Sequence, residues 1–212
     1  GLRGGDAVSV GTYDRASGLD YRQKLQGRAA FPLLSTNLVD PETGRPVFTP
    51  VLHLNRAGVS AAVIGLLPGD LEGAGYRTAD PLATAKTAVA AAREQGAELV
   101  ILLSALDPDD EQKLAKKVKG IDLILSSGDR SRTDPAVWIR SAALVHAGGR
   151  GKYLGRVVHD ASEAGRGRLV PALVPVESGG PVDEDVLELV EETRLRHESP
   201  EFVEAGKEAV PP

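Results

Sequence analysis

Short apolar runs alternate with amphipathic stretches through the middle of the chain. Three runs rich in Val, Ile and Leu predict buried β-strands at 61–67, 98–104 and 121–126. Apolar residues at helical spacing predict a helix over 81–95, which begins at Asp80-Pro81 and ends at Gly96. A second helix is predicted over 109–119, capped by Asp109 or Asp110. Strands separated by helices at this spacing indicate a parallel sheet.

The segments on either side of this pattern are less regular. A strand over 6–11 is predicted to join the same parallel core, followed by a helical turn at 21–25 and strands at 31–39 and 47–55. After Arg132, glycine-rich turns separate short runs at 137–139, 142–145, 153–159 and 169–176, which favours an antiparallel sheet. Asp183 then begins a helix that runs to Arg196. The fold class is therefore α/β, with one domain over 1–197 and a charged, proline-ended tail over 198–212.

Composition narrows the function classes. The chain has 212 residues, 42% hydrophobic and 26% charged, with a net charge of −5, so it lacks the basic surface that nucleic acid requires. No apolar run is long enough to predict a membrane span. The absence of cysteine excludes disulfides, thiolate metal sites and cysteine nucleophiles.

Candidate chemistry follows the strand at 121–126, because loops after parallel strands meet at one edge of a sheet. This loop offers hydroxyl, carboxylate and guanidinium groups but no histidine. The four histidines, at 53, 146, 159 and 197, lack ligand spacing and are interpreted as structural or surface residues. Asp107, Asp109 and Asp110 are interpreted as helix-capping residues, and Gly148–Gly151 as a turn. Arg130 and Arg132 could bind an anion, but a solvated loop with local ion pairs is the favoured interpretation of these residues.

Eight short stretches occur in an order and at a spacing that are typical of one known protein family. They are Asp6–Asp14, Phe31–Asn37, Val63–Leu66, Asp80-Pro81, Leu102–Ala105, Gly120–Arg130, Ala147-Gly148 and Gly151–Arg156. Together they resemble the 5'-nucleotidase-type metallophosphoesterases of the calcineurin class, from Asp6 to about Arg196. The resemblance implies a sandwich of mixed β-sheets flanked by α-helices, and a site at which two divalent metal ions activate water against a phosphate.

The family's ligand positions can be carried over one at a time. The asparagine ligand falls on Thr12, the catalytic histidine beside it on Tyr13, the histidine after leucine-leucine-serine on Ala105, and the paired histidines on Gly128 and Arg130. None of these residues matches, and the family's earlier motifs would precede residue 1. The resemblance thus predicts a vestigial site without catalytic residues, metal or cofactor. Its members are Thr12, Tyr13, Asp14, Ala105, Asp107, Ser127, Gly128, Asp129 and Arg130, which are expected to converge.

Three functions follow from this resemblance. The first is a degenerate, non-catalytic domain, or pseudoenzyme, that acts as a binding or structural module. The second is an active phosphoric ester hydrolase seen as a fragment, and the third is an anion-binding domain that uses Arg130 and Arg132. A phosphate-containing small molecule is the expected partner, and a further domain or chain is expected to cover an open sheet edge. The family resemblance implies a periplasmic or extracellular location.

Overall fold

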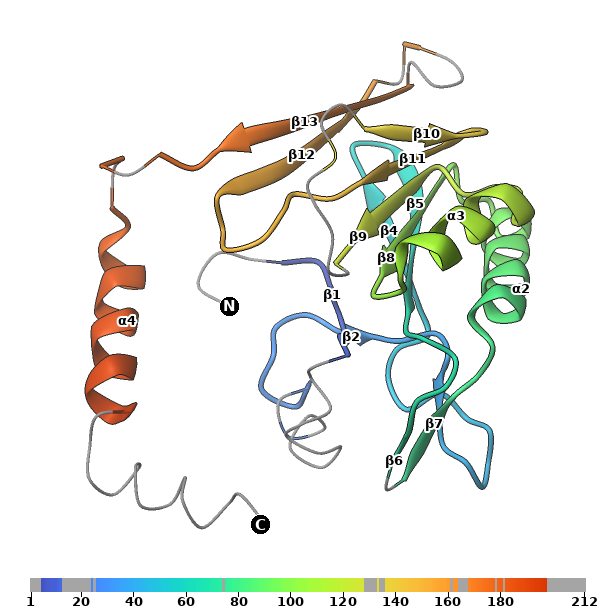
Figure 1. Cartoon of the computed structure of the whole chain (residues 1–212), viewed down its shortest axis with the longest axis horizontal. Helices are drawn as coiled ribbons and strands as arrows, with labels where there is room; N and C mark the ends of the chain where they lie inside the picture. Colours follow the sequence, from blue (N-terminus) through green and yellow to red (C-terminus); the bar gives the residue numbers. More distant parts are fainter. Residues whose placement is uncertain are drawn as a thin grey trace. The chain divides into compact units, whose positions relative to one another are not determined.

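The structure is a computed structural model, shown in Figure 1. The residues it describes are 5–12, 24, 26–73, 75–127, 133, 136–160, 162–163, 168–177, 179–180 and 182–197. They fall into two units, of which one ends at Val176 and the other begins at Glu177. The two units are described separately below.

A six-stranded mixed sheet forms the centre of the first unit. Its spatial order is β10 (Val137–Ile139), β11 (Ala142–Val145), β9 (Leu123–Ser126), β8 (Leu99–Ser104), β5 (Val59–Leu66) and β4 (Val51–Arg56). The four inner strands are parallel, and the two edge strands are antiparallel to their neighbours. The three apolar runs predicted as buried strands are thus adjacent in one sheet, as the alternation of strands and helices indicated.

Two helices cover one face of this sheet, as Figure 1 shows for α2 (Pro81–Glu94) and α3 (Pro108–Lys117). Asp80 accepts a hydrogen bond from the Ala83 amide at 2.6 Å and so caps α2, as predicted. The cap of α3 is Asp107 rather than Asp109 or Asp110, because Pro108 occupies the first helical position. The helices and the sheet enclose the main apolar core, in which Ile64, Leu102 and Ile124 are fully buried.

A clamp between Arg93 and Asp122 joins the end of α2 to the strand β9. The Arg93 guanidinium donates to the carbonyl oxygens of Ala97, at 2.7 Å, and Gly120, at 2.9 Å, and also to the Asp122 carboxylate. Asp122 accepts a further hydrogen bond from the Val100 amide at 2.8 Å. These contacts connect the helix, β8 and β9 at the end of the sheet opposite the predicted site.

A β-hairpin packs on the other face of the sheet. Its strands β12 (Tyr153–His159) and β13 (Leu169–Pro175) are antiparallel, and Leu169 and Val157 contact Leu123 and Ala143 of the sheet. This arrangement corrects one expectation. The segment after residue 136 does not form a single antiparallel sheet, because β11 joins the central sheet parallel to β9 and only β12 and β13 pair separately.

The N-terminal strands also differ from the prediction. β1 (Val8–Ser9) pairs with β2 (Leu33–Leu34) in a separate two-stranded parallel sheet, so the segment 6–11 is not part of the central parallel core. This small sheet lies against β5, since a Cβ added at Gly65 would approach the Ser9 hydroxyl to 2.8 Å and the Leu34 carbonyl oxygen to 2.9 Å. The partner of a strand is determined by contacts between residues that are far apart in the sequence, and the local pattern of apolar residues does not specify those contacts.

The predicted strand at 31–39 is interrupted. β2 ends at Leu34, and β3 (Leu38–Val39) pairs instead with β7 (Tyr76–Thr78), which also pairs with β6 (Glu72–Gly73). Between them, the fully buried Asn37 side chain donates to the carbonyl oxygens of Leu67, at 2.7 Å, and Ala79, at 3.0 Å. It also accepts from the Leu67 amide at 2.9 Å. The side-chain amide of Asn37 thus takes the place of backbone pairing where the segments around residues 37, 67 and 79 meet.

The second unit contains the helix α4 (Glu184–His197). Asp183 accepts from the Val186 amide at 3.2 Å and caps this helix, as its position in the sequence predicted. None of the helices in the described part of the chain is long and apolar enough to cross a membrane. The predicted α/β class, with mixed sheets flanked by helices, is confirmed.

Candidate functional site

The carboxyl ends of the parallel strands are held together by backbone and serine groups. Ser104, at the end of β8, lies in register between Leu66 of β5 and Ser126 of β9. The Ser104 carbonyl oxygen accepts from the Ser127 amide at 2.8 Å and from the Ser127 hydroxyl at 3.0 Å. The Ala105 amide donates to the Leu66 carbonyl oxygen at 3.0 Å. In α/β proteins the catalytic or binding groups usually follow the strand ends. Here the groups at the ends of β5, β8 and β9 form hydrogen bonds with one another.

Ala105, the first residue after β8, is partly buried and makes apolar contacts. Ala105 packs against a small cluster that contains the buried residues Val10 and Leu67. Val10 follows β1, and Thr12 lies two residues further along the chain. The segment that leads to Thr12 and the residue Ala105 therefore meet in one cluster at this edge, and a methyl group occupies the position at which the family resemblance expects an imidazole.

Asp107 has a structural role in the described geometry. Its carboxylate accepts from the amides of Asp109 and Asp110, both at 3.0 Å, at the beginning of α3. Asp110 in turn accepts from the Lys113 ammonium at 2.8 Å, and this hydrogen bond raises the pKa of Lys113. Both carboxylates are therefore engaged locally, as acidic groups at a helix N-terminus commonly are.

A cavity of about 510 Å³ lies between the loop after β5 and the beginnings of α2 and α3. Its charged lining consists of Asp70, Asp80, Asp107, Asp110 and Lys113. Asp80 and Asp107 cap the two helices, and Asp110 is paired with Lys113. The lining therefore offers an exposed Asp70 and otherwise carboxylates that already accept hydrogen bonds.

His146 is the residue at this edge that the sequence interpretation passed over as an ordinary structural histidine. It follows β11 directly and is buried, with 7% of its surface exposed. Its amide donates to the Thr133 hydroxyl at 2.8 Å, and its Nδ1 atom accepts from the Gly148 amide at 3.2 Å. In the neutral ring the hydrogen is therefore assigned to Nε2. The sequence signal for His146 is its position at the end of a strand, and the parallel pairing of β11 with β9 brings that end to the same edge as Ser126.

The remaining residues of the predicted site and of the predicted anion-binding pair lie outside the described part of the chain. They are Tyr13, Asp14, Gly128, Asp129, Arg130 and Arg132. The predicted convergence of the whole set therefore stays a prediction. Of the members that are described, Ala105, Asp107 and Ser127 follow the strands β8 and β9, and Thr12 follows β1.

A divalent metal requires several oxygen or nitrogen ligands in a fixed arrangement. Across the described ranges, no three carboxylate or imidazole side chains lie close enough together to hold such an ion. Ala105 supplies no ligand atom, and Ser127 and Asp107 are engaged in hydrogen bonds. The described residues thus do not fit the metal pair that the family resemblance implies.

The comparisons with known proteins agree on one group. The chain is 40% identical over 67 residues to a 5'-nucleotidase of Vibrio parahaemolyticus, a match covering 32% of this chain and 12% of that protein. It is 28% identical over 138 residues to the uncharacterized metallophosphoesterase YunD of Bacillus subtilis, covering 63% of this chain and 30% of that protein. The sulfate thiohydrolase SoxB of Thermus thermophilus superposes with a TM-score of 0.82 at 26% identity, covering 92% of this chain and 38% of that chain. No protein-family model matches the chain.

The homologues and structural neighbours of this chain are therefore 5'-nucleotidases and calcineurin-like metallophosphoesterases, and the resemblance predicted from the sequence motifs is confirmed. The aligned region spans 12% and 30% of the length of the two curated relatives above, and 38% of the SoxB chain. The activity of a whole relative is accordingly a property of a longer polypeptide.

One prediction is wrong as it was made. The sequence interpretation assigned no cofactor to this protein, but its homologues are metallophosphoesterases, which use divalent metal ions. A divalent cation is thus the cofactor that the comparisons indicate for this group of proteins. The prediction failed because it equated the loss of individual ligand positions with the loss of any metal, a step that ligand positions alone do not justify.

Proposed function

We propose that this chain is a degenerate metallophosphoesterase-type domain that does not turn over phosphate esters and acts as a binding or structural module. The observation that carries the proposal is the environment of Ala105. Where the family resemblance expects a histidine, a methyl group packs against Val10 and Leu67. An alanine methyl group supplies no nitrogen atom with which to hold a metal ion that would activate water.

The hydroxyl groups at this edge give the same proposal further support. Hydrolysis in this class needs a nucleophile generated at neutral pH, and neither serine nor threonine does this without a base or a metal. The Ser127 hydroxyl donates to a backbone carbonyl oxygen at 3.0 Å, so its hydrogen is engaged in the structure. The proposal concerns turnover, and a divalent ion bound by the protein is compatible with it.

The test is hydrolysis of p-nitrophenyl phosphate, bis(p-nitrophenyl) phosphate and AMP by the purified chain, with Mn²⁺, Co²⁺ or Zn²⁺ added. We expect rates equal to those of metal and buffer alone, while a 5'-nucleotidase assayed beside it is active. Metal content is measured in the same samples, so that a metal-loaded but inactive protein is recognised. Metal-dependent hydrolysis that Asp129→Ala abolishes would overturn the proposal.

A second candidate is an active phosphoric ester hydrolase of which this sequence is one part. The observation that favours it is coverage, because the chain aligns with 38% of the SoxB chain and 30% of YunD. The two candidates differ in one measurement. The product of the complete gene should hydrolyse the same substrates if the second holds, and should be as inactive as the chain alone if the first holds.

The other predictions from the sequence stay proposals. Anion binding by Arg130 and Arg132 is supported by the charge of these residues alone, and a phosphate-containing small molecule is its expected ligand. We also propose a periplasmic or extracellular location by analogy with the relatives, and a domain over 1–197 followed by a tail. A further domain or chain that covers an open sheet edge also stays a proposal. It is supported by the two-stranded hairpin β12–β13, in which Leu154 and Val170 are 62% and 52% exposed.

A further inference from the structure

Among the described residues, the strands β12 and β13 pair only with each other, so the hairpin has two open edges. In an antiparallel pair of strands, opposite residues alternate between those that hydrogen-bond to each other and those whose backbone groups point outward. The Val176 amide donates to the Lys152 carbonyl oxygen at 2.9 Å, and the Asp160 amide donates to the Arg168 carbonyl oxygen at 2.8 Å. The register between these two bonds is regular, so the odd-numbered residues of both strands direct their amide and carbonyl groups away from the hairpin.

The two edges differ in their prolines. On β13, two of the outward positions are Pro171 and Pro175, which have no amide hydrogen to donate. Proline on an edge strand is a common means of preventing another strand from adding there. On β12 no outward position is proline, and the backbone groups of Gly155, Val157 and His159 form no hydrogen bond across that edge with any described residue. The β12 edge is therefore the one at which a further strand can pair.

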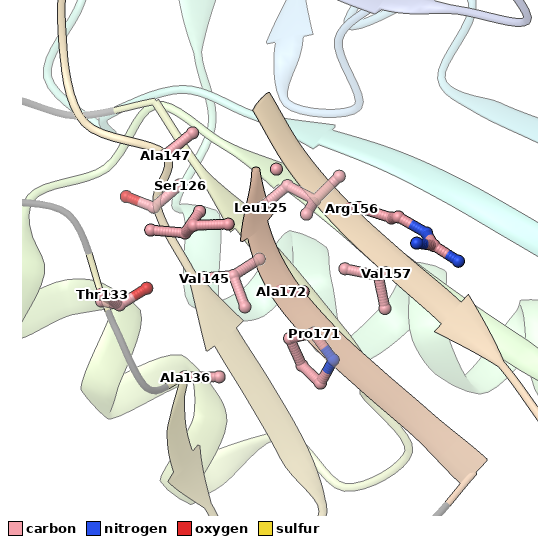
Figure 2. Close-up of a pocket in the computed structure, with 12 residues that line it drawn as sticks. Leu125, Ser126, Thr133, Ala136, Val145, Ala147, Arg156, Val157, Pro171 and Ala172 are labelled. Carbon is pink, nitrogen blue, oxygen red and sulfur yellow. The ribbon is translucent and has the colours of Figure 1, made fainter. Parts of the chain in front are cut away.

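The outer face of β12 carries one cation between apolar side chains. Leu154, Arg156 and Val158 lie on the same face of the strand, and all three are exposed. Figure 2 shows that the Arg156 side chain points away from the other labelled residues, which line the cavity between the hairpin and the central sheet. Arg156 belongs to none of the ion pairs among the described residues, so its guanidinium is available to a partner.

A second copy of this chain is a poor partner for this edge. If two β12 strands paired antiparallel over their full length, Arg156 would lie directly opposite its counterpart in the other copy, because it is at the centre of 153–159. Like charges at directly opposite positions destabilise a pair of strands, whereas opposite charges stabilise it. A shifted register would separate the two arginines but would lose backbone hydrogen bonds. The edge therefore favours a strand of different sequence, with an acidic residue at this position.

We propose that the β12 edge binds an extended segment of a partner chain, which adds as a strand and carries an acidic residue opposite Arg156. The backbone of this segment pairs with the outward groups of β12, as when a peptide adds to the open edge of a sheet. Its acidic side chain lies beside the guanidinium, and apolar residues two positions away on either side lie beside Leu154 and Val158. The inference rests on the covering chain proposed above, for which it specifies the edge and the sequence, and it is independent of phosphate ester hydrolysis.

The probe is a fluorescein-labelled peptide of sequence Lys-Thr-Val-Val-Glu-Val-Val-Thr-Lys, whose terminal lysines keep it soluble. Binding to the purified chain is followed by fluorescence anisotropy, and we expect saturable one-to-one binding. A second peptide, with lysine in place of the glutamate, should bind about threefold to tenfold more weakly, because a like-charge pair replaces an opposite-charge pair. Non-specific attraction to a chain of net charge −5 would favour the lysine peptide instead, so the expected preference is specific.

A change of charge on the protein should reverse this preference. In Arg156→Glu, the lysine peptide should bind more tightly than the glutamate peptide, since the opposite-charge pair is then formed by the lysine. The matched control is Arg77→Glu, which makes the same change of charge at an exposed position of β7. This control should prefer the glutamate peptide to the same extent as the unmodified chain.

The pairing of the backbone is tested by amide hydrogen exchange and by proline. The bound glutamate peptide should slow exchange at the amides of Gly155, Val157 and His159. The amides of Leu169 and Leu173, on the β13 edge, should exchange at the same rate as without peptide. Gly155→Pro removes an outward amide of β12 and should weaken binding about tenfold or more. Leu173→Pro removes the outward amide directly opposite, on β13, and should bind the peptide like the unmodified chain.

Three outcomes would overturn the proposal. The first is the absence of saturable binding of the glutamate peptide to the unmodified chain, and the second is a preference between the peptides that Arg156→Glu leaves unchanged. The third is a concentration-dependent dimer in sedimentation that Gly155→Pro abolishes, because a second copy would then occupy the edge. Folding of each variant is checked by circular dichroism. If Gly155→Pro does not fold, the exchange rates and the reversal of charge preference decide the question.

Discussion

The helix-covered face of the central sheet and the edge formed by its carboxyl ends can be compared residue by residue. On the helix-covered face, polar side chains stabilise the helix ends and connect them to the sheet. Asp80 caps α2, and Arg93 and Asp122 clamp the sheet to the helix. At the carboxyl edge, Ala105 stands where the family resemblance expects a histidine, and its methyl group packs against Val10 and Leu67.

This difference shows that the residues that hold a strand end in position are not the residues whose side chains would carry out a reaction there. The Ala105 amide still donates to the Leu66 carbonyl oxygen at 3.0 Å, and that hydrogen bond needs no particular side chain. A ligand position can therefore change while the strand that presents it keeps its place. The reverse does not hold, since a change in the scaffold would move the whole edge. The predictions below test this asymmetry.

The largest effect is expected at Asn37, in the scaffold. Asn37→Leu leaves the Leu67 amide and the carbonyl oxygens of Leu67 and Ala79 buried without their side-chain partner. Each unpaired buried group costs about 1–3 kcal/mol, so the free energy of unfolding should fall by about 3 kcal/mol or more. Urea unfolding at equilibrium measures it. Asn55→Leu, at an exposed position of β4, is the matched control, and equal losses in the two variants would refute the role of Asn37.

The second prediction concerns the carboxyl edge itself. Ala105→His inserts an imidazole into the contact with Val10 and Leu67, and overpacking of this kind costs about 1–3 kcal/mol. We expect lower stability and no gain of phosphate ester hydrolysis with Mn²⁺ added, because a single imidazole does not complete a metal site. Ala90→His, at an exposed position of α2, should cost about 0.7 kcal/mol or less. Metal-dependent turnover by Ala105→His would mean that the other ligands are present.

The sequence was sufficient wherever structure depends on neighbours along the chain. Asp80-Pro81 and Gly96 mark the ends of α2 because caps act over a few residues, and the three apolar runs became β5, β8 and β9. The pairing of β1 with β2 was not predictable in this way. It depends on contacts with Gly65, which lies far away in the sequence, and the pattern of apolar residues is the same for either partner.

The candidate site was harder to predict than the helices, because the neighbours of its residues also lie far away in the sequence. The resemblance named Ala105 and Ser127 correctly as residues at strand ends, but it did not reveal what their neighbours do. Asp107 was interpreted as a helix-capping residue and also assigned to the vestigial site, and its carboxylate caps α3. The hairpin β12–β13 packs against residues of β9 and β11, and no local pattern relates those strands to the distant residues 153–175.

The third prediction separates these two roles of Asp107. Asp107→Ala removes the acceptor for two amides at the beginning of α3 and should lower the free energy of unfolding by about 1 kcal/mol. Asp107→Asn should retain most of the stability, because an asparagine oxygen caps equally well. Thermal unfolding of both variants gives the result. The exposed Asp70→Ala serves as the control, and a loss in Asp107→Asn as large as in Asp107→Ala would show that the charge matters rather than the cap.

The smallest effect is expected at Ser127, which belongs to the edge. Its hydroxyl donates to the Ser104 carbonyl oxygen at 3.0 Å, and its own amide donates to the same oxygen at 2.8 Å. Ser127→Ala therefore leaves that oxygen paired, and the loss should be about 0.5 kcal/mol, the lower end for one hydrogen bond. Equilibrium urea unfolding detects a difference of this size when the unmodified chain is measured in parallel. A loss above about 1.5 kcal/mol would exceed what one hydroxyl hydrogen bond contributes, and would show that the serine at the edge supports the fold as Asn37 does in the scaffold.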